Sequence, residues 1–321
     1  MRHLLKDTDL TPDELLDLVL VARLIKRRPA AVRGRLAGCS VGLLFEKPSL
    51  RTRVSTETAC ALLGAHPVSL RGDELHLHRG ETPADCARVL SGYLDLLMAR
   101  VVSHQLLVDL ASVNELPVVN GLCDRFHPLQ ALADLLTIVD GFNGRLRGVR
   151  VTYLGDGNNV ATSLMLAGVM VGVSVTLSCP EGYQVPPALL AEAERIARVS
   201  GGTVALEPDP VRAVAEAQVL YTDVWTSMGD EGEEDMRRQA LERYQINREL
   251  VAAAPSDAIV LHCLPAHFDE EITREIFDSP RSRVVPQAHN RLPTAAASFL
   301  FLLNRELFYQ VRKQYGDVPI G

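Results

Sequence analysis

A nine-residue segment early in the chain concentrates groups that bind anions. It reads Phe45-Glu46-Lys47-Pro48-Ser49-Leu50-Arg51-Thr52-Arg53 and lies between a predicted strand and a predicted helix. Ser49 is a good N-cap for that helix, and the backbone N–H groups after an N-cap have no acceptor within the helix. A helix N-terminus with added hydroxyl and guanidinium groups is typical of a phosphate site. An ordinary capped helix with exposed arginines is the alternative.

A second candidate site follows the segment Asn120-Gly121-Leu122-Cys123-Asp124. His127-Pro128-Leu129-Gln130 opens a predicted helix, and His127 and Gln130 are three positions apart, so both side chains can point the same way. A histidine before a proline can be a simple turn residue. Its position between a strand and a helix favours a functional role, because α/β proteins bind ligands at such turns.

A glycine-rich turn follows in the second half of the chain, with the sequence Gly155-Asp156-Gly157-Asn158-Asn159. It is similar to the G-x-G-x-x-G loop that binds dinucleotides, but Val160 stands at the third glycine position. A nicotinamide-dependent dehydrogenase is therefore the weaker alternative. The asparagine amides favour hydrogen bonds to a polar substrate.

An acidic residue, Asp223, ends a further predicted strand. It is followed by Val224-Trp225-Thr226-Ser227-Met228-Gly229 and a charged stretch, a pattern typical of a flap that excludes water once substrate is bound. A simple surface loop is the alternative.

A cysteine with histidines nearby is found in His262-Cys263-Leu264-Pro265-Ala266-His267. Neighbours in a strand point to opposite faces, so we expect no direct Cys–His dyad and a polar or charge-bearing role for Cys263. The histidines are too few and too irregularly spaced to indicate a zinc site. Asn290-Arg291-Leu292, before the last predicted helix, indicates little by itself.

The elements that must position these residues alternate between short β-rich runs and longer helical runs, which predicts an α/β fold with mostly parallel sheets. The main expected helices are Thr11–Arg27, Ser49–Leu63, His127–Asp140, Pro187–Ser200 and Thr294–Gln310. The expected strands are Val41–Phe45, Leu94–Val101, Leu116–Asn120, Val149–Gly155, Val173–Ser178, Thr203–Glu207, Gln218–Trp225, Ala258–Leu264 and Ser282–Val285.

A length of 321 residues fits about two domains. The Gly- and Arg-rich segment Gly141–Gly148 is the best candidate for a junction. We therefore expect two doubly wound parallel-sheet domains, 1–145 and 146–293, with the helix 294–310 packing back on the first. In such a fold the active site lies in the cleft between the domains, beyond the carboxyl ends of the strands.

The composition is that of a globular protein, with 47% hydrophobic and 23% charged residues. The net charge of −7 argues against a nucleic-acid partner, and we expect no membrane partner because no apolar run reaches the length of a membrane span. The first residues mix charges of both signs and do not resemble a signal peptide. The six cysteines are scattered without a C-x-x-C pair, which favours buried thiols and the reducing cytoplasm.

Taken in this order, the six motifs resemble those of the aspartate/ornithine carbamoyltransferase family, and the match extends from about Arg2 to Leu303. Ser-x-Arg-Thr-Arg is similar to the motif of the whole family. Asp-x-Trp-x-Ser-Met-Gly together with His-Cys-Leu-Pro resembles the ornithine branch. The resemblance implies transfer of the carbamoyl group of carbamoyl phosphate to the side-chain amine of ornithine, giving citrulline and phosphate in arginine metabolism.

The resemblance also assigns roles to residues. Arg100, His127, Asp223 and Cys263 would be catalytic. Carbamoyl phosphate would bind to Ser49, Leu50 (through its backbone), Arg51, Thr52, His76, Arg100, His127, Gln130, Cys263, Leu264 and Arg291. Ornithine would bind to Asn159, Asp223, Ser227 and Met228.

The reaction itself needs no metal and no organic cofactor. The family further implies a cis peptide at Leu264–Pro265 and a homotrimer, or a multiple of trimers, in which a neighbouring subunit lends a residue from the loop around His76–Arg79. His76 replaces a glutamine of the family, and His289 replaces a glutamate close to Arg291. Two alternatives stay open: a carbamoyltransferase for a related amine such as putrescine or an acylated ornithine, and a non-catalytic paralogue.

Overall fold

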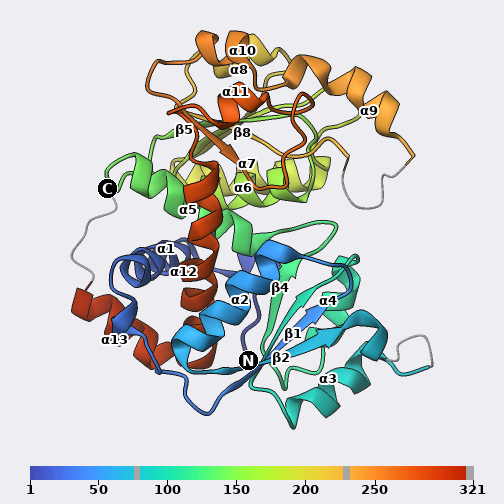
Figure 1. Cartoon of the computed structure of the whole chain (residues 1–321), viewed down its shortest axis with the longest axis vertical. Helices are drawn as coiled ribbons and strands as arrows, with labels where there is room; N and C mark the ends of the chain where they lie inside the picture. The colour runs from blue at the N-terminus through green and yellow to red at the C-terminus, as the bar shows by residue number, and fades with distance from the viewer. Residues whose placement is uncertain (76–79, 227–231, 316–321) are drawn as a thin grey trace. The chain divides into compact units, whose positions relative to one another are not determined.

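The computed structural model of the chain describes residues 1–75, 80–226 and 232–315. These residues form two compact units, one made of 1–136 and 289–315 and the other of 137–288. Each unit is built on a parallel β-sheet flanked by helices, with four strands in the first and five in the second (Figure 1). The predicted class of two α/β domains with parallel sheets is therefore confirmed. None of the described helices is both long and apolar enough to cross a membrane.

The sheet of the first unit has the strand order β2-β1-β3-β4. Its central strand β1 is predicted well because it is buried on both faces, and Val41, Leu43 and Leu44 are all 0% exposed. The strands are β1 (Ser40–Phe45), β2 (His66–Arg71), β3 (Leu96–Arg100) and β4 (Val118–Leu122). The helices that connect or cover them are α1 (Pro12–Arg27), α2 (Leu50–Leu63), α3 (Pro83–Ser91), α4 (His104–Ala111), α13 (Arg305–Tyr315), the part of α5 (Pro128–Gly141) before residue 137 and the part of α12 (Val284–Leu303) after residue 288.

The N-terminal segment is tied to this unit by hydrogen bonds. Leu4 pairs with the backbone of β4, donating to Val118 O at 2.8 Å. Thr11 then caps α1 in a capping box with Glu14. The carboxylate of Glu14 also accepts hydrogen bonds from Arg2 and from Arg305 of α13. The two ends of the first unit are thus joined at one buried carboxylate.

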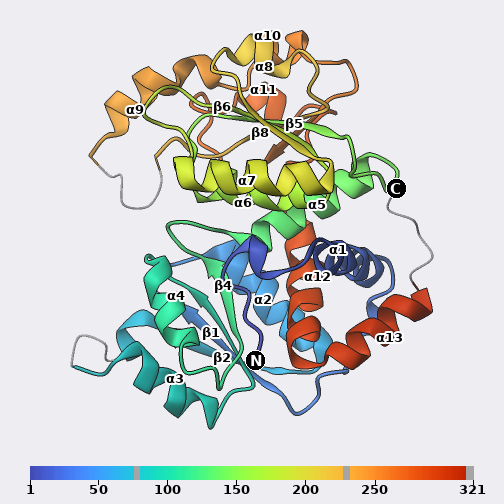
Figure 2. The ribbon, with the colours of Figure 1, turned by 180° about the vertical axis from the view of Figure 1, so that it is seen from behind.

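The sheet of the second unit has the order β7-β6-β5-β8-β9. Helices α6 and α7 lie on one side of it, and α8, α10 and α11 lie on the other (Figures 1 and 2). The strands are β5 (Arg150–Leu154), β6 (Ser174–Ser178), β7 (Thr203–Leu206), β8 (Val219–Thr222) and β9 (Ile259–His262). The helices are α6 (Asn159–Met170), α7 (Pro187–Ser200), α8 (Pro210–Val214), α9 (Glu234–Leu241), α10 (Arg248–Ala253) and α11 (Arg274–Phe277).

Each sheet has a point where the direction of strand addition reverses. In the first unit this point lies between β1 and β3, and in the second between β5 and β8. Loops that leave the carboxyl ends of such strands diverge to opposite faces and leave a crevice for ligands. The segment before α2 and the end of β3 flank the first switch point. The glycine-rich turn after β5 and Asp223 after β8 flank the second.

Two predicted elements near the C-terminus were wrong. The expected strand Ser282–Val285 is only an isolated bridge between Ser282 and Val260, and α12 begins at Val284. The two valines suggested a strand, whereas Pro286 in the first turn of α12 suits a helix start. The single helix expected over Thr294–Gln310 is two helices, because Asn304 ends α12 and its side chain caps α13 by accepting from Leu307 N.

Strand β2 escaped prediction because it lies at the edge of its sheet. It is only half-buried, so the sequence of His66–Arg71 lacks a continuous apolar run. Pro67 within it also argues against a strand, yet a proline is tolerated on an edge strand where the missing N–H is not needed.

Candidate functional site

The hydroxyl of Thr52 joins two arginines that are far from it in the sequence. Thr52 lies in the first turn of α2 and is 1% exposed. Its Oγ1 accepts hydrogen bonds from Nη1 of Arg100 at 3.2 Å and from Nη2 of Arg291 at 3.1 Å. Arg100 is the last residue of β3, and Arg291 comes from α12. Two positive charges therefore lie at the carboxyl edge of the first sheet, beside the N-terminus of α2.

The guanidinium of Arg291 is also held by a glutamine. Its Nη1 donates to Oε1 of Gln130 at 2.6 Å, and Nε2 of Gln130 donates to Oδ1 of Asp134 one turn further along α5 at 2.8 Å. Arg291 is 4% exposed and Gln130 is 2% exposed. A guanidinium fixed by two acceptors is a preorganised anion donor.

His127 is buried in the same cluster of positive charge. Burial lowers the pKa of its imidazole well below the usual value, and Arg291, Arg100 and Arg51 lower it further. The ring is therefore neutral at pH 7, with one nitrogen able to donate a hydrogen bond and the other able to accept one. A neutral histidine can donate to a carbonyl oxygen without adding a further charge to the cluster.

The residues that open α2 differ in what they offer. Ser49 occupies the N-cap position, but its hydroxyl makes no capping hydrogen bond to the helix. Leu50 is 74% exposed, so its side chain does not line a buried site. The guanidinium of Arg51 contributes to the field at His127. Arg53 lies elsewhere, with its guanidinium over the ring of Phe45 and a hydrogen bond to Ser69.

Six of the predicted carbamoyl phosphate residues thus form one cluster in the first unit. They are Arg51, Thr52, Arg100, His127, Gln130 and Arg291. His76, also predicted for this ligand, lies outside the described residues.

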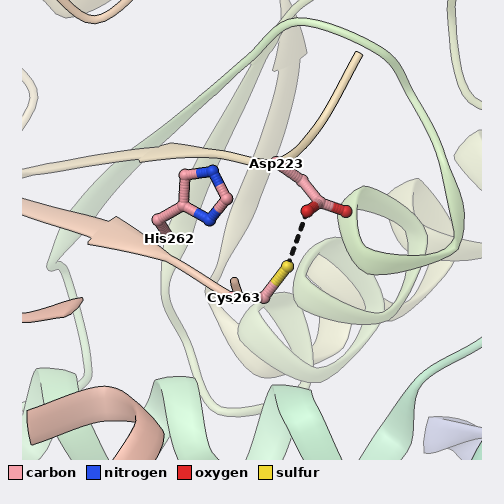
Figure 3. A group of neighbouring side chains, drawn as sticks. All are labelled: Asp223, His262 and Cys263. Carbon is pink, nitrogen blue, oxygen red and sulfur yellow. Dashed lines mark hydrogen bonds between the residues drawn. The ribbon is translucent and has the colours of Figure 1, made fainter. Parts of the chain in front are cut away.

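A second cluster forms around Asp223 in the other unit. Asp223 follows β8 and is 6% exposed. Its Oδ1 accepts from the thiol of Cys263 at 2.7 Å, and its Oδ2 accepts from Nδ2 of Asn158 at 2.9 Å. Figure 3 shows the thiol of Cys263 facing this carboxylate, with the ring of His262 beside them. Asp223 is therefore a carboxylate aimed by two neutral donors.

Asn158 is held in turn by the helix that it caps. Its Oδ1 accepts from the backbone N–H groups of Val160 and Ala161 at 2.9 and 3.1 Å, and from the hydroxyl of Tyr153 at 3.2 Å. The predicted residue Asn159 is the first residue of α6 and is half-buried. Asn158 thus connects the N-terminus of α6 to Asp223 across the switch point.

The expectation that His262 and Cys263 form no dyad holds, but the reason given for it was wrong. Cys263 lies beyond the end of β9, and its sulfur is within 4.8 Å of a ring nitrogen of His262. The dyad is absent because both ring nitrogens are used. Nδ1 accepts from Leu264 N at 2.8 Å, and Nε2 donates to the buried carboxylate of Glu271 at 2.9 Å. A metal ion on His262 would have to displace one of these bonds.

Two further predictions concern the same region. The Leu264–Pro265 peptide bond is cis, as the family resemblance implied. Ser227 and Met228, predicted for ornithine, lie outside the described residues.

All six cysteines are free thiols, and four of them are buried, which confirms that they form no disulfide scaffold.

Several residues of the two clusters were missed in the sequence. Asp134 holds Gln130, Asn158 holds Asp223, and Glu271 holds His262. The spacing of four between Gln130 and Asp134 on one helix was an available signal. Asn158 could have been recognised as the N-cap of the helix after the glycine-rich turn. Glu271 lies in a charged run and had no local signal.

Comparisons with known proteins place the whole chain in one family. Residues 2–140 match the family model described as the aspartate/ornithine carbamoyltransferase carbamoyl-P binding domain, and residues 147–302 match that of the Asp/Orn binding domain. The ornithine carbamoyltransferase of Acidothermus cellulolyticus is 49% identical over 304 residues, covering 95% of this chain and 97% of that protein. The anabolic ornithine carbamoyltransferase of Pyrococcus furiosus is 47% identical over 293 residues, covering 91% and 93%.

Solved structures give the same result. The ornithine carbamoyltransferase structure from Pyrococcus furiosus aligns with a TM-score of 0.89 at 46% identity, covering 93% of this chain and 96% of that one. The structure from Gloeobacter violaceus aligns with a TM-score of 0.85 at 42% identity, covering 94% and 98%. With both family models matched over most of its length, the chain belongs to the aspartate/ornithine carbamoyltransferase family.

Proposed function

We propose that this protein transfers the carbamoyl group of carbamoyl phosphate to the side-chain amine of ornithine, giving citrulline and phosphate. The observation that carries the proposal is the buried cluster in which Arg100 and Arg291 converge on Thr52 beside the neutral ring of His127. This cluster suits a small dianion with an adjacent carbonyl group. The chain matches nearly the whole length of relatives that are named ornithine carbamoyltransferase, and these names support ornithine as the acceptor.

The phosphate of the donor would bind at the start of α2. Free backbone N–H groups at a helix N-terminus, the hydroxyls of Ser49 and Thr52 and the guanidinium of Arg51 all donate hydrogen bonds to phosphate oxygens. Leu50 takes part through its backbone, which is consistent with its exposed side chain.

The carbamoyl end would lie against Arg100, His127 and Gln130. Arg291 would hold Gln130 in place through their hydrogen bond. The amine nitrogen of ornithine attacks the carbamoyl carbon, and the electrons of the carbonyl bond move onto its oxygen. The tetrahedral state then collapses: the carbonyl bond re-forms, the bond from carbon to the phosphate oxygen breaks, and phosphate leaves with that electron pair and takes up the proton that the attacking nitrogen loses. Fixed donors at the oxygen stabilise the charge that develops there, and removing one such donor typically costs ~3–4 kcal/mol of barrier.

The acceptor would bind to the second cluster. A buried carboxylate such as Asp223 attracts an ammonium group, and the thiol of Cys263 and the amide of Asn158 hold that carboxylate in place. Asn159 at the N-terminus of α6 suits the carboxylate of an amino acid. Ser227 and Met228 complete the proposed acceptor residues, and the attacking amine must lose a proton to become a nucleophile.

We further propose a homotrimer in the cytoplasm, in which a neighbouring subunit contributes His76 to the donor site. Two pairs of exposed apolar side chains in the first unit support an interface there. Leu50 and Val54 are one turn apart on α2 and are 74% and 52% exposed, and Val89 and Tyr93 are four positions apart and 54% and 73% exposed. The free thiols support a reducing compartment.

One assay tests the function and its alternatives. Purified protein is given carbamoyl phosphate with ornithine, putrescine or N-acetylornithine, and both the carbamoylated amine and phosphate are measured. We expect citrulline and phosphate in equal amounts when the amine is ornithine, and no product with the other two amines. Turnover with putrescine or N-acetylornithine in place of ornithine would assign a related amine, and binding of carbamoyl phosphate without turnover of any amine would indicate a non-catalytic paralogue.

A further inference from the structure

Arg237 of α9 bonds to both loops that flank the switch point of the second sheet. Its Nη1 donates to Oδ2 of Asp156 at 3.0 Å, in the turn after β5. The same Nη1 donates to the backbone oxygen of Trp225 at 3.1 Å, in the segment after β8. The side chains of Arg237 and Asp156 are only 11% and 13% exposed, so this ion pair is largely shielded from water.

The guanidinium of Arg237 also contacts an aromatic ring and a carboxylate at the start of its own helix. It lies over the ring of Tyr183, with 5.3 Å from the guanidinium carbon to the ring centroid, and Nε donates to Glu233 at 3.3 Å. The backbone of Tyr183 accepts from Gly157 N at 2.7 Å, next to Asp156. A Cβ added to Gly157 would come within 2.4 Å of a backbone nitrogen, so this turn is closely packed. Arg237 therefore links α9 to the closely packed turn after β5 and to the segment after β8.

These contacts lie next to the proposed acceptor site without being part of it. Asp156 is two positions before Asn158, and Trp225 is two positions after Asp223. Asn158 and Asp223 are themselves joined at 2.9 Å. Two cross-links thus span the same switch point, one through Asn158 and one through Arg237.

We infer that Arg237, with Asp156 as its partner, is a positioning residue that sets the carboxylate of Asp223 for the ammonium group of ornithine. The inference rests on the proposed function. Loss of Arg237 would remove one of the two cross-links between the chain after β8 and the turn after β5, and Asn158 and Cys263 alone would then set the direction of Asp223. The hydroxyls and arginines proposed for carbamoyl phosphate lie in the first unit, and Cys263 and Leu264 lie after β9, whereas Arg237 bonds to the turn after β5 and the segment after β8, so binding of the donor should change little.

The test compares steady-state kinetics of the full-length protein with Arg237→Gln, Arg237→Lys and Asp156→Asn. Arg238→Gln is the matched control, because Arg238 is the next residue of α9 and also forms an ion pair, with Glu270 at 2.7 Å, but its side chain is 61% exposed. We expect Arg237→Gln and Asp156→Asn to raise the KM for ornithine roughly tenfold, with the KM for carbamoyl phosphate within about twofold of the wild type. Arg237→Lys keeps the charge without the planar group over Tyr183, so it should recover part of the loss.

The outcomes separate this inference from the proposed function. Wild-type protein that does not carbamoylate ornithine would overturn the proposed function, and this role with it. An active wild type with an Arg237→Gln variant that matches Arg238→Gln would overturn the inference alone. So would an equal rise in both KM values, or unfolded protein from both Arg237→Gln and Asp156→Asn, because the pair would then serve folding in general.

Discussion

Replacing Thr52 by valine probes the cluster of the first unit with the least change in shape. Valine has nearly the volume of threonine, so the exchange removes one hydroxyl and leaves no cavity. Thr52 Oγ1 accepts from Arg291 at 3.1 Å and from Arg100 at 3.2 Å, at the long end of the N–H···O range. The bond from the buried Arg291 contributes ~1.5 kcal/mol and that from the half-buried Arg100 about 0.5 kcal/mol.

Thr52→Val should therefore destabilise the first unit by about 2 kcal/mol, which for a unit of this size corresponds to a Tm lower by roughly 4–8 °C. Thr56→Val is the matched control. Thr56 is also buried on α2, but its hydroxyl donates to the backbone oxygens of Thr52 and Arg53 at 2.8 and 3.1 Å, and within the described part of the chain it accepts no hydrogen bond from a guanidinium group. That loss should cost less than ~1 kcal/mol, because backbone carbonyls keep their helical partners.

The assay is thermal unfolding followed by circular dichroism, together with the KM for carbamoyl phosphate. Thr52→Val should raise that KM about tenfold, because the hydroxyl is a proposed phosphate donor and also holds both arginines. Thr56→Val should change it by less than about twofold. Equal Tm shifts for the two variants would refute the view that Thr52 joins the arginines, and an unchanged KM would place the phosphate elsewhere.

Three further predictions concern single residues of the two clusters. Burial and three arginines lower the pKa of His127, so below about pH 6.5 the unfolded chain binds a proton that the folded protein does not, and the free energy of unfolding falls as the pH falls. His127→Gln should reduce the slope of this dependence by up to ~1.4 kcal/mol per pH unit, measured by urea unfolding between pH 5 and 7.5. An unchanged slope would contradict the prediction. Arg51→Ala should weaken carbamoyl phosphate binding by ~1.5–3 kcal/mol, whereas Arg53→Ala, whose side chain contacts Phe45 and Ser69, should have little effect in the same titration. Cys263→Ser should keep the hydrogen bond to Asp223 and most of the affinity for ornithine, whereas Cys263→Ala should raise the KM for ornithine about five- to tenfold; equal losses would show that the thiol acts otherwise.

The helices and strands that the sequence predicts are those whose own residues show a pattern typical of that element. The buried strands β1 and β3 contain continuous apolar runs, and α1 begins at a Thr11–Glu14 capping box that is visible in the sequence. The edge strand β2 and the start of α12 were missed because their stability depends on neighbours. Strand β2 forms at the edge of its sheet, where the missing N–H of Pro67 is not needed for pairing with β1. Helix α12 begins directly after Arg283, whose backbone N–H donates to the backbone oxygen of Val260.

The candidate site divides in the same way. Ser49–Thr52, His127 and Gln130 were identifiable because hydroxyl, imidazole and amide groups stand at strand-to-helix turns. Arg291, in contrast, is 239 residues from Thr52 and 161 from Gln130, and its own segment indicated little. Glu271 likewise lies in an ordinary charged run, yet it is fully buried against His262.

The sequence alone therefore determined the class of fold and the chemical types at the site, since strand periodicity, caps and local motifs act over a few residues. Tertiary structure alone decided which of those groups converge. The parallel strands bring the segment before α2, Arg100 and His127 to one edge, and the packing of α12 adds Arg291. The neutral charge state of His127 also arises only there, because burial and the fields of distant arginines act through space and leave no mark in the local sequence.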